Sequence, residues 1–187
     1  MNTMPSTRYH NYLQDNAVCF WTSAIISRVP VFRSRTAARA VLAIWDECRV
    51  RCNVRLVGYV IMPDHIHVAF WAEHAEDAMR FLRQSLGMIS ARIAALAEQA
   101  GGRDPTVATW LRMFKAHAGD GQQVRVWKER GRGYPVTDME TLLQKLNYMH
   151  CNPVQAKLAR VPEEWEFSSA AWYTSGTGPL RLDDVPL

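Results

Sequence analysis

Two histidines separated by one residue are the side chains best suited to bind a metal ion. His65 and His67 lie in an otherwise apolar run that we expect to be a strand. Because strand side chains alternate between faces, both imidazoles point the same way and can converge on one divalent ion, while Ile66 and Val68 point into the core. Two ligands are too few for a good site. Two surface histidines, or one hydrogen-bonded core histidine, also fit this pattern.

A tyrosine and an asparagine further along the chain could complete such a site. Tyr148 and Asn152 are four residues apart in a predicted helix, so they share a face. The amide oxygen of Asn152 is a hard ligand that suits Mg²⁺ or Mn²⁺. A Tyr148 phenolate could attack phosphorus and form a covalent phosphotyrosine, with help from a metal or a base because the pKa of free tyrosine is about 10. A half-buried structural tyrosine also fits. We expect His150 to be solvated on a different face.

Basic and aromatic residues cluster just before that helix and are candidates for contact with nucleic acid. Gly131 and Gly133 allow the backbone to approach phosphates closely. Aromatic rings in the cluster could stack on unpaired bases. A solvated loop with its tryptophan in the core also fits. The candidate residues are Arg125, Trp127, Lys128, Arg130, Arg132 and Tyr134.

The composition is that of a globular protein with an unusual choice of basic residue. Of 187 residues, 48% are hydrophobic and 21% charged, and the net charge is +4. The 22 basic residues are 18 Arg and 4 Lys. The planar guanidinium matches phosphate geometry, although a GC-rich genome also favours arginine. No apolar run has the length of a membrane span, and residues 1–15 lack the apolar core of a signal peptide. We therefore expect a cytoplasmic protein without a membrane partner.

Strands and helices alternate along the predicted chain. Apolar, β-branched runs predict strands, and apolar residues at three- and four-residue spacing predict helices. The expected strands cover residues 17–26, 54–62, 65–71 and 124–127. The expected helices cover residues 36–52, 76–99 and 138–151. Residues 101–123 mix glycine and proline with a short apolar piece, which predicts a connection.

This order of elements predicts an α+β fold. A ferredoxin-like antiparallel sheet with helices on one face would satisfy it. We expect a single domain over residues 1–187, in which residues 161–187 form a C-terminal tail that wraps back on the domain.

The motifs in combination resemble a known family. The string MPDHIH at residues 62–67, followed by NYMHCNPV at residues 147–154, resembles the single-tyrosine HUH transposases of bacterial insertion sequences. The resemblance is greatest to the REP-associated tyrosine transposases. In the tail, WEFSS at residues 165–169 is similar to a family signature, an aromatic residue before a Ser-Ser pair. The resemblance runs from about Tyr9 to Tyr173.

The resemblance implies a site and a reaction. It implies that His65, His67 and Asn152 are the metal ligands, that Tyr148 is the nucleophile, and that Mg²⁺ or Mn²⁺ is the cofactor. The implied substrate is single-stranded or hairpin DNA, which is cleaved and rejoined through a covalent 5′-phosphotyrosine. Members act as monomers or as homodimers. The chain departs from many members at Asp64, where Asn is frequent, and after Asn152, where Gln-Ala-Lys replaces a common Arg-Ala-Gly.

Other functions fit the same residues. A rolling-circle replication initiator or relaxase-type nickase uses the same histidine pair and tyrosine chemistry, but usually has a different tyrosine context and added domains. A non-catalytic hairpin DNA-binding protein derived from a transposase is the second alternative. The presence of both histidines together with Tyr148 and Asn152 favours an enzyme.

Overall fold

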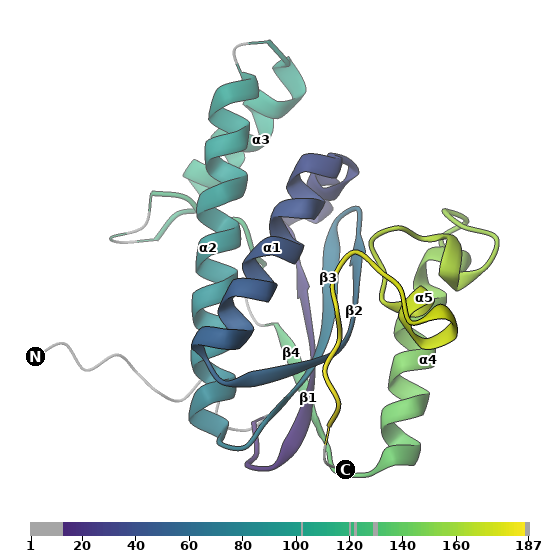
Figure 1. The fold of residues 1–187 in the computed structure, drawn as a ribbon. Helices are drawn as coiled ribbons and strands as arrows, with labels where there is room; N and C mark the ends of the chain where they lie inside the picture. The colour runs from purple at the N-terminus through teal and green to yellow at the C-terminus, as the bar shows by residue number, and fades with distance from the viewer. Residues whose placement is uncertain (1–12, 102, 120, 122, 129–130, 186–187) are drawn as a thin grey trace, which may run out of the picture.

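A four-stranded antiparallel sheet forms the centre of the protein (Figure 1). The structure is a computed structural model that describes residues 13–101, 103–119, 121, 123–128 and 131–185. The strands are β1 (Ala17–Ala24), β2 (Val54–Met62), β3 (His65–Ala72) and β4 (Arg132–Val136). Their order in the sheet is β2-β3-β1-β4, and every neighbouring pair is antiparallel. With one helix after β1 and another after β3, this is the ferredoxin-like arrangement, so the predicted α+β class is confirmed.

Helices cover both faces of this sheet (Figure 1). The expected pair, α1 (Arg35–Arg51) and α2 (Ala75–Gly101), packs on one face, and α4 (Met139–Gln155) packs on the other. Beyond the end of the sheet, α3 (Pro105–Ala116) runs back along α2. A short α5 (Ala170–Ser175) follows in the tail. Short 3-10 turns cover Ile26–Arg28, Val31–Arg33 and Pro162–Glu164. No helix within the described ranges combines the length and apolarity needed to cross a membrane.

Side-chain alternation along the strands gives each face of the sheet its own apolar core. Ile66 and Phe70 of β3 pack toward α1 and α2, whereas Ala69 and Trp71 pack toward α4. The edge strand β2 keeps its apolar residues in step by means of a β-bulge between Leu56 and Gly58.

Gly58 at this bulge allows α4 to approach the sheet closely. A Cβ placed on Gly58 would lie 2.5 Å from Leu146 Cδ2 and 2.9 Å from Met149 Cε. Its partner across the ladder is Ala69, which is also small. The helix that carries Tyr148 therefore approaches the sheet at a point where the two facing strand residues are small.

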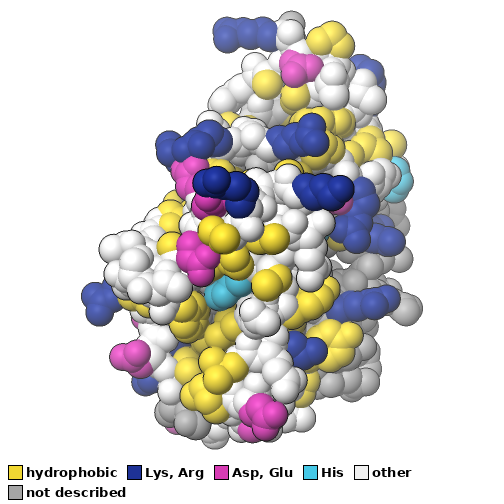
Figure 2. All heavy atoms as spheres, turned by 90° about the vertical axis from the view of Figure 1, so that its right-hand side faces the viewer, with side chains coloured by type: hydrophobic (Ala, Val, Ile, Leu, Met, Phe, Trp, Pro, Cys, Tyr) yellow, Lys and Arg dark blue, Asp and Glu magenta, His cyan; other side chains and the backbone are white. Residues whose placement is uncertain are grey.

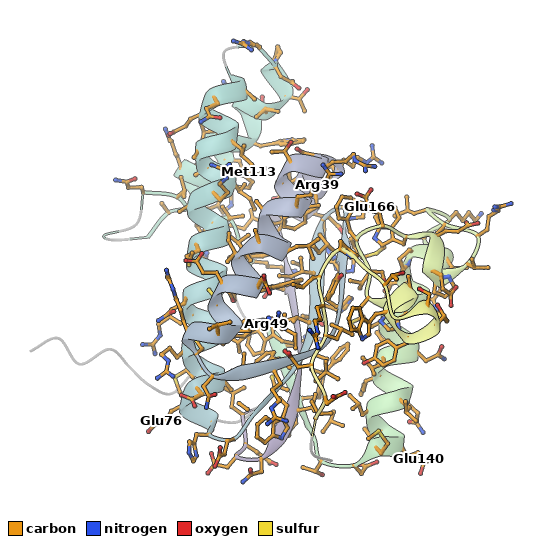
Figure 3. All side chains as sticks on the ribbon, in the orientation of Figure 1. Arg39, Arg49, Glu76, Met113, Glu140 and Glu166 are labelled. Atoms are coloured by element: carbon orange, nitrogen blue, oxygen red, sulfur yellow. The ribbon has the colours of Figure 1, made fainter. Side chains whose placement is uncertain are left out.

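The C-terminal tail covers the otherwise open edge of β2. The Asp183 backbone N–H donates to Leu56 O at 2.8 Å, and its carboxylate accepts from Leu56 N–H at 2.9 Å and from Arg49 at 2.8 Å. Further along β2, Ser169 N–H donates to Tyr59 O at 3.0 Å. Figure 3 shows Arg39 of α1 close to Glu166 of the tail, with which it forms an ion pair at 3.3 Å. An edge strand capped in this way cannot pair with another chain.

Two predicted elements were wrong. The fourth strand is not residues 124–127, which form only an isolated bridge between Trp127 and Ile25, but Arg132–Val136. Gly133 and Pro135 disfavour a strand over Arg132–Val136, so the sequence did not predict one there. Because β4 is an edge strand, it tolerates Pro135 without loss of a ladder hydrogen bond.

The predicted connection at residues 101–123 contains the helix α3. The side chain of Asp104 caps it by accepting from Thr106 N–H and Val107 N–H, and Pro105 occupies the first turn. This Asp-Pro pair was the signal for a helix start. Phe114 anchors the helix in the core.

We expect Gly58→Ala to destabilise the fold by about 1–3 kcal/mol, because the new methyl group forces α4 away from β2. Urea unfolding measures this loss. Gly87→Ala is the matched control, since a Cβ at that position in α2 meets nothing within 4 Å and alanine favours a helix by about 0.5–1 kcal/mol. Equal effects of the two substitutions would contradict the close approach of α4.

Candidate functional site

His65 and His67 share one face of β3, as the alternation predicted, and this is the face that α4 covers. Their ring centroids are 5.0 Å apart. His67 is buried, and its Nδ1 lies 2.6 Å from Thr22 Oγ1, the residue opposite it on β1. His65 Nδ1 lies 2.6 Å from Asp64 Oδ1. In each ring, Nδ1 has a neighbouring side chain as its partner, so Nε2 is the nitrogen that could bind a ligand.

The surroundings of His67 keep its ring neutral. Burial, together with the nearby charges of His65 and Arg28, lowers the pKa of His67 to about 3. A neutral imidazole has a lone pair that can bind a metal ion. Among the described residues, the buried His67 Nε2 has no hydrogen-bond partner.

Tyr148 of α4 lies beside this pair. Its ring centroid is 6.3 Å from that of His67, and the two rings meet edge to face. The tyrosine is 53% exposed, so its ring is reachable by a large substrate. The three rings of His65, His67 and Tyr148 therefore form a continuous row, although β3 and α4 are distant in sequence.

Asn152 lies one helical turn beyond Tyr148, and its amide group is already oriented. Its Nδ2 donates to Tyr148 O at 2.8 Å and to Met149 O at 3.2 Å. Pro153, which lies inside α4 and does not end it, has no N–H to offer Met149 O, so the side chain of Asn152 replaces that missing donor. Because the nitrogen is committed to the helix, Oδ1 is the atom that remains for a ligand.

The chemistry of these donors fits a divalent cation. An imidazole nitrogen that is buried without a partner costs free energy unless something binds it. In the part of the chain that the structure describes, no group of three or more His, Cys, Asp or Glu residues is arranged to hold a metal. A third protein ligand beside His65 and His67 would therefore have to be of another residue type, and the amide oxygen of Asn152 is the candidate that the sequence predicted.

Two of the candidate DNA-binding residues lie on the same face of the sheet. Arg132 is paired with Thr22, and Tyr134 is paired with Phe20, whose ring stacks 5.7 Å from His67. Tyr134 is 47% exposed, and Lys145 Nζ of α4 lies 5.2 Å from its ring centroid. Figure 2 shows that lysine and arginine side chains gather on the upper part of the face that α4 presents.

The other members of that cluster lie elsewhere. Trp127 packs against Phe32 at 6.2 Å and donates from Nε1 to Leu86 O at 3.0 Å, so it belongs to the core and is not placed to stack on bases. Arg125 is half-buried, and its backbone N–H donates to Phe114 O. Lys128 is exposed, and its backbone N–H donates to Ala24 O beside the site. Arg130 lies outside the described residues.

His150 is buried, contrary to the expectation that it is solvated. Its Nε2 lies 2.8 Å from Ser169 Oγ, and that hydroxyl also accepts from Tyr59 N–H at 2.8 Å. A buried serine of the tail thus links α4 to β2. The Ser-Ser pair was the sequence signal, but its partner could not be read from spacing.

Comparisons with known proteins agree with this fold. No protein-family model and no curated protein matches the chain. Among solved structures, the chain is similar to a REP-associated tyrosine transposase bound to a REP hairpin, with a TM-score of 0.61 and 14% identity over 100% of this chain and 94% of that one. It is also similar to a candidate transposase from Deinococcus radiodurans R1, with a TM-score of 0.46 and 17% identity over 79% of this chain and 95% of that one. The first similarity confirms, for the fold, the resemblance predicted from the motifs.

We expect the free energy of unfolding to fall as the pH decreases from 6.5 to 4. Burial lowers the pKa of His150 from 6.5 to about 4, so in this range the unfolded chain binds a proton that the folded protein excludes. One such group contributes at most about 1.4 kcal/mol per pH unit. Urea unfolding at pH 7 and pH 5 measures the loss. His150→Gln should show a smaller loss, because glutamine can donate to Ser169 but does not titrate. Equal losses in the two proteins would contradict the role of His150.

Proposed function

We propose that this protein is a transposase-like enzyme that cleaves and rejoins single-stranded or hairpin DNA, with Tyr148 as its nucleophile. The row formed by Tyr148, His67 and His65 carries the proposal, because it sets a half-exposed tyrosine ring beside two neighbouring imidazoles. The fold shared with a REP-associated tyrosine transposase bound to a REP hairpin supports the same class of substrate.

The proposed reaction exchanges one phosphoester for another. The phenol oxygen of Tyr148 forms a bond to phosphorus while the bond from phosphorus to the 3′ oxygen of the preceding nucleotide breaks. The phenol proton is lost to solvent, and the 3′ oxygen takes up a proton to become a hydroxyl. The 5′ phosphate stays on the protein. Attack by a 3′-hydroxyl reverses the step and joins DNA, so no nucleotide cofactor is required.

Three residues would hold the metal ion in this proposal. They are His65, His67 and Asn152, through two imidazole nitrogens and one amide oxygen. When bound, Mg²⁺ or Mn²⁺ would supply positive charge to an oxygen of the scissile phosphate. Thr22 and Asp64 orient the two imidazoles through their Nδ1 atoms.

The DNA would pass over β4 beside this centre. Arg132 supplies a guanidinium for a phosphate, and Tyr134 supplies an exposed ring for an unpaired base. Lys128 and Arg130 add positive charge in the segment before β4. Trp127 and Arg125 are not part of this proposed surface. A cytoplasmic location and a monomeric or homodimeric state stay predictions.

The decisive experiment looks for a covalent protein–DNA adduct. The wild-type protein is incubated with Mn²⁺ and a pool of DNA hairpins that have randomised single-stranded flanks. The DNA is labelled at its 3′ end, because the strand on that side of the cut stays on the protein. We expect a labelled adduct on a denaturing gel with the wild type, and none with Tyr148→Phe. Tyr173→Phe is the control, since the ring of Tyr173 lies beside His150 and its hydroxyl donates to Val57 O, away from His65 and His67.

An adduct that persists in Tyr148→Phe would exclude Tyr148 as the nucleophile. A wild-type protein that binds the hairpins but forms no adduct with Mn²⁺ or Mg²⁺ would contradict the enzyme and favour the non-catalytic binding protein.

We expect Thr22→Val to weaken Mn²⁺ binding about 10- to 100-fold, because removal of a hydrogen bond to a ligating histidine frees its ring to turn. Isothermal titration calorimetry measures the affinity without any DNA. Thr22→Ser keeps the hydroxyl and should bind Mn²⁺ nearly as the wild type does. An unchanged affinity in Thr22→Val would contradict the role of His67 as a ligand.

A further inference from the structure

We propose that Arg28 binds a DNA backbone phosphate adjacent to the scissile one. This inference rests on the proposed function, since it concerns the same site. Arg28 was not part of the basic cluster predicted before α4. It lies beside the turn that precedes β3, whereas Arg132 lies on β4.

The fold holds Arg28 at the start of β3. The segment after β1 wraps around the turn between β2 and β3: Ile25 N–H donates to Asp64 O, and Phe32 N–H donates to Pro63 O, each at 2.9 Å. Arg28 lies between these two anchors. It is thereby kept beside the turn from which His65 begins.

The backbone at Arg28 is strained. Ser27 has a φ of 54° and Arg28 a φ of 56°, so two consecutive residues other than glycine adopt the left-handed conformation. This conformation costs free energy for residues with a Cβ. The hydrogen bond from Ile26 N–H to Val126 O at 2.9 Å and the anchors at Asp64 and Pro63 impose it.

The partner of Arg28 does not account for this arrangement. Arg28 Nη1 lies 3.4 Å from Asp64 Oδ2, and the arginine side chain is 61% exposed, so the pair contributes little to stability. The other carboxylate oxygen of Asp64 holds His65 at 2.6 Å. By contrast, Arg49 is 15% exposed and pairs with both Asp46 and Asp183. The ion pair of Arg28 with Asp64 is therefore weak, although the backbone at Arg28 adopts an unfavourable conformation.

The chemistry of this position suits a phosphodiester. A guanidinium has five N–H donors in a planar fork that matches two phosphate oxygens, and the ion pair with Asp64 uses one of them. An anion bound beside His65 would therefore meet the exposed guanidinium of Arg28.

The test measures DNA binding without cleavage, in the Tyr148→Phe background. Fluorescence anisotropy gives the Kd for a hairpin with single-stranded flanks over a series of salt concentrations. Arg28→Ala should weaken binding about tenfold and reduce the slope of log Kd against log salt by about 0.7, the value for one phosphate contact on a single strand. Arg28→Lys should keep the slope but recover only part of the affinity, because lysine has no fork.

Arg51→Ala is the matched control. Arg51 is 59% exposed and pairs with Glu47 on α1. It precedes the start of β2, which pairs with the end of β3, so it lies at the opposite end of the sheet from His65. We expect this variant to match the Tyr148→Phe parent in both Kd and slope.

Two results would overturn the inference. One is a salt slope in Arg28→Ala equal to that of the parent. The other is a loss of Mn²⁺ affinity in Arg28→Ala with no change in DNA binding, which would make Arg28 only a support for Asp64. Neither measurement depends on a covalent adduct, so a failure of the proposed reaction would be recognised separately.

Discussion

The alternation of side chains along β3 is the constraint on which the rest of the structure depends. One short strand must supply Ile66 and Val68 to the core under α1 and α2, and two imidazoles to the opposite face. A slip of one residue would exchange the two sets and bury the imidazoles among apolar side chains. The pairing with β1 prevents the slip and also sets Thr22 opposite His67. The same register that forms the core therefore orients the proposed metal ligand.

The position of α4 is the second requirement, because that helix carries the proposed nucleophile. Gly58 lets the helix approach the sheet, and the buried hydroxyl of Ser169 joins His150 to the backbone of Tyr59. The tail that supplies Ser169 also covers the edge of β2. Stability and the geometry of the site are thus coupled, since a change that loosens the tail would also move Tyr148 relative to the histidines.

The excess of arginine has more than one cause in the structure. Arg35 and Arg39 share Glu166, and Arg49 and Arg51 pair with carboxylates of their own helix. These pairs neutralise much of the positive charge of α1. The arginines that bear on the proposed function are the few near the histidines, and a count of arginines could not distinguish them from the paired ones.

The sequence by itself determined the local features: the alternation around His65 and His67, the helical spacing that puts Tyr148 and Asn152 on one face, and most element boundaries. Periodicity and sequence spacing report on neighbours along the chain. Only the tertiary structure decided that α4 lies over the histidines, that Trp127 belongs to the core, and that the fourth strand forms around Pro135. Those outcomes depend on contacts between distant segments, such as Thr22 with His67 or Ser169 with Tyr59. There, burial and hydrogen bonding across the fold outweigh local propensity.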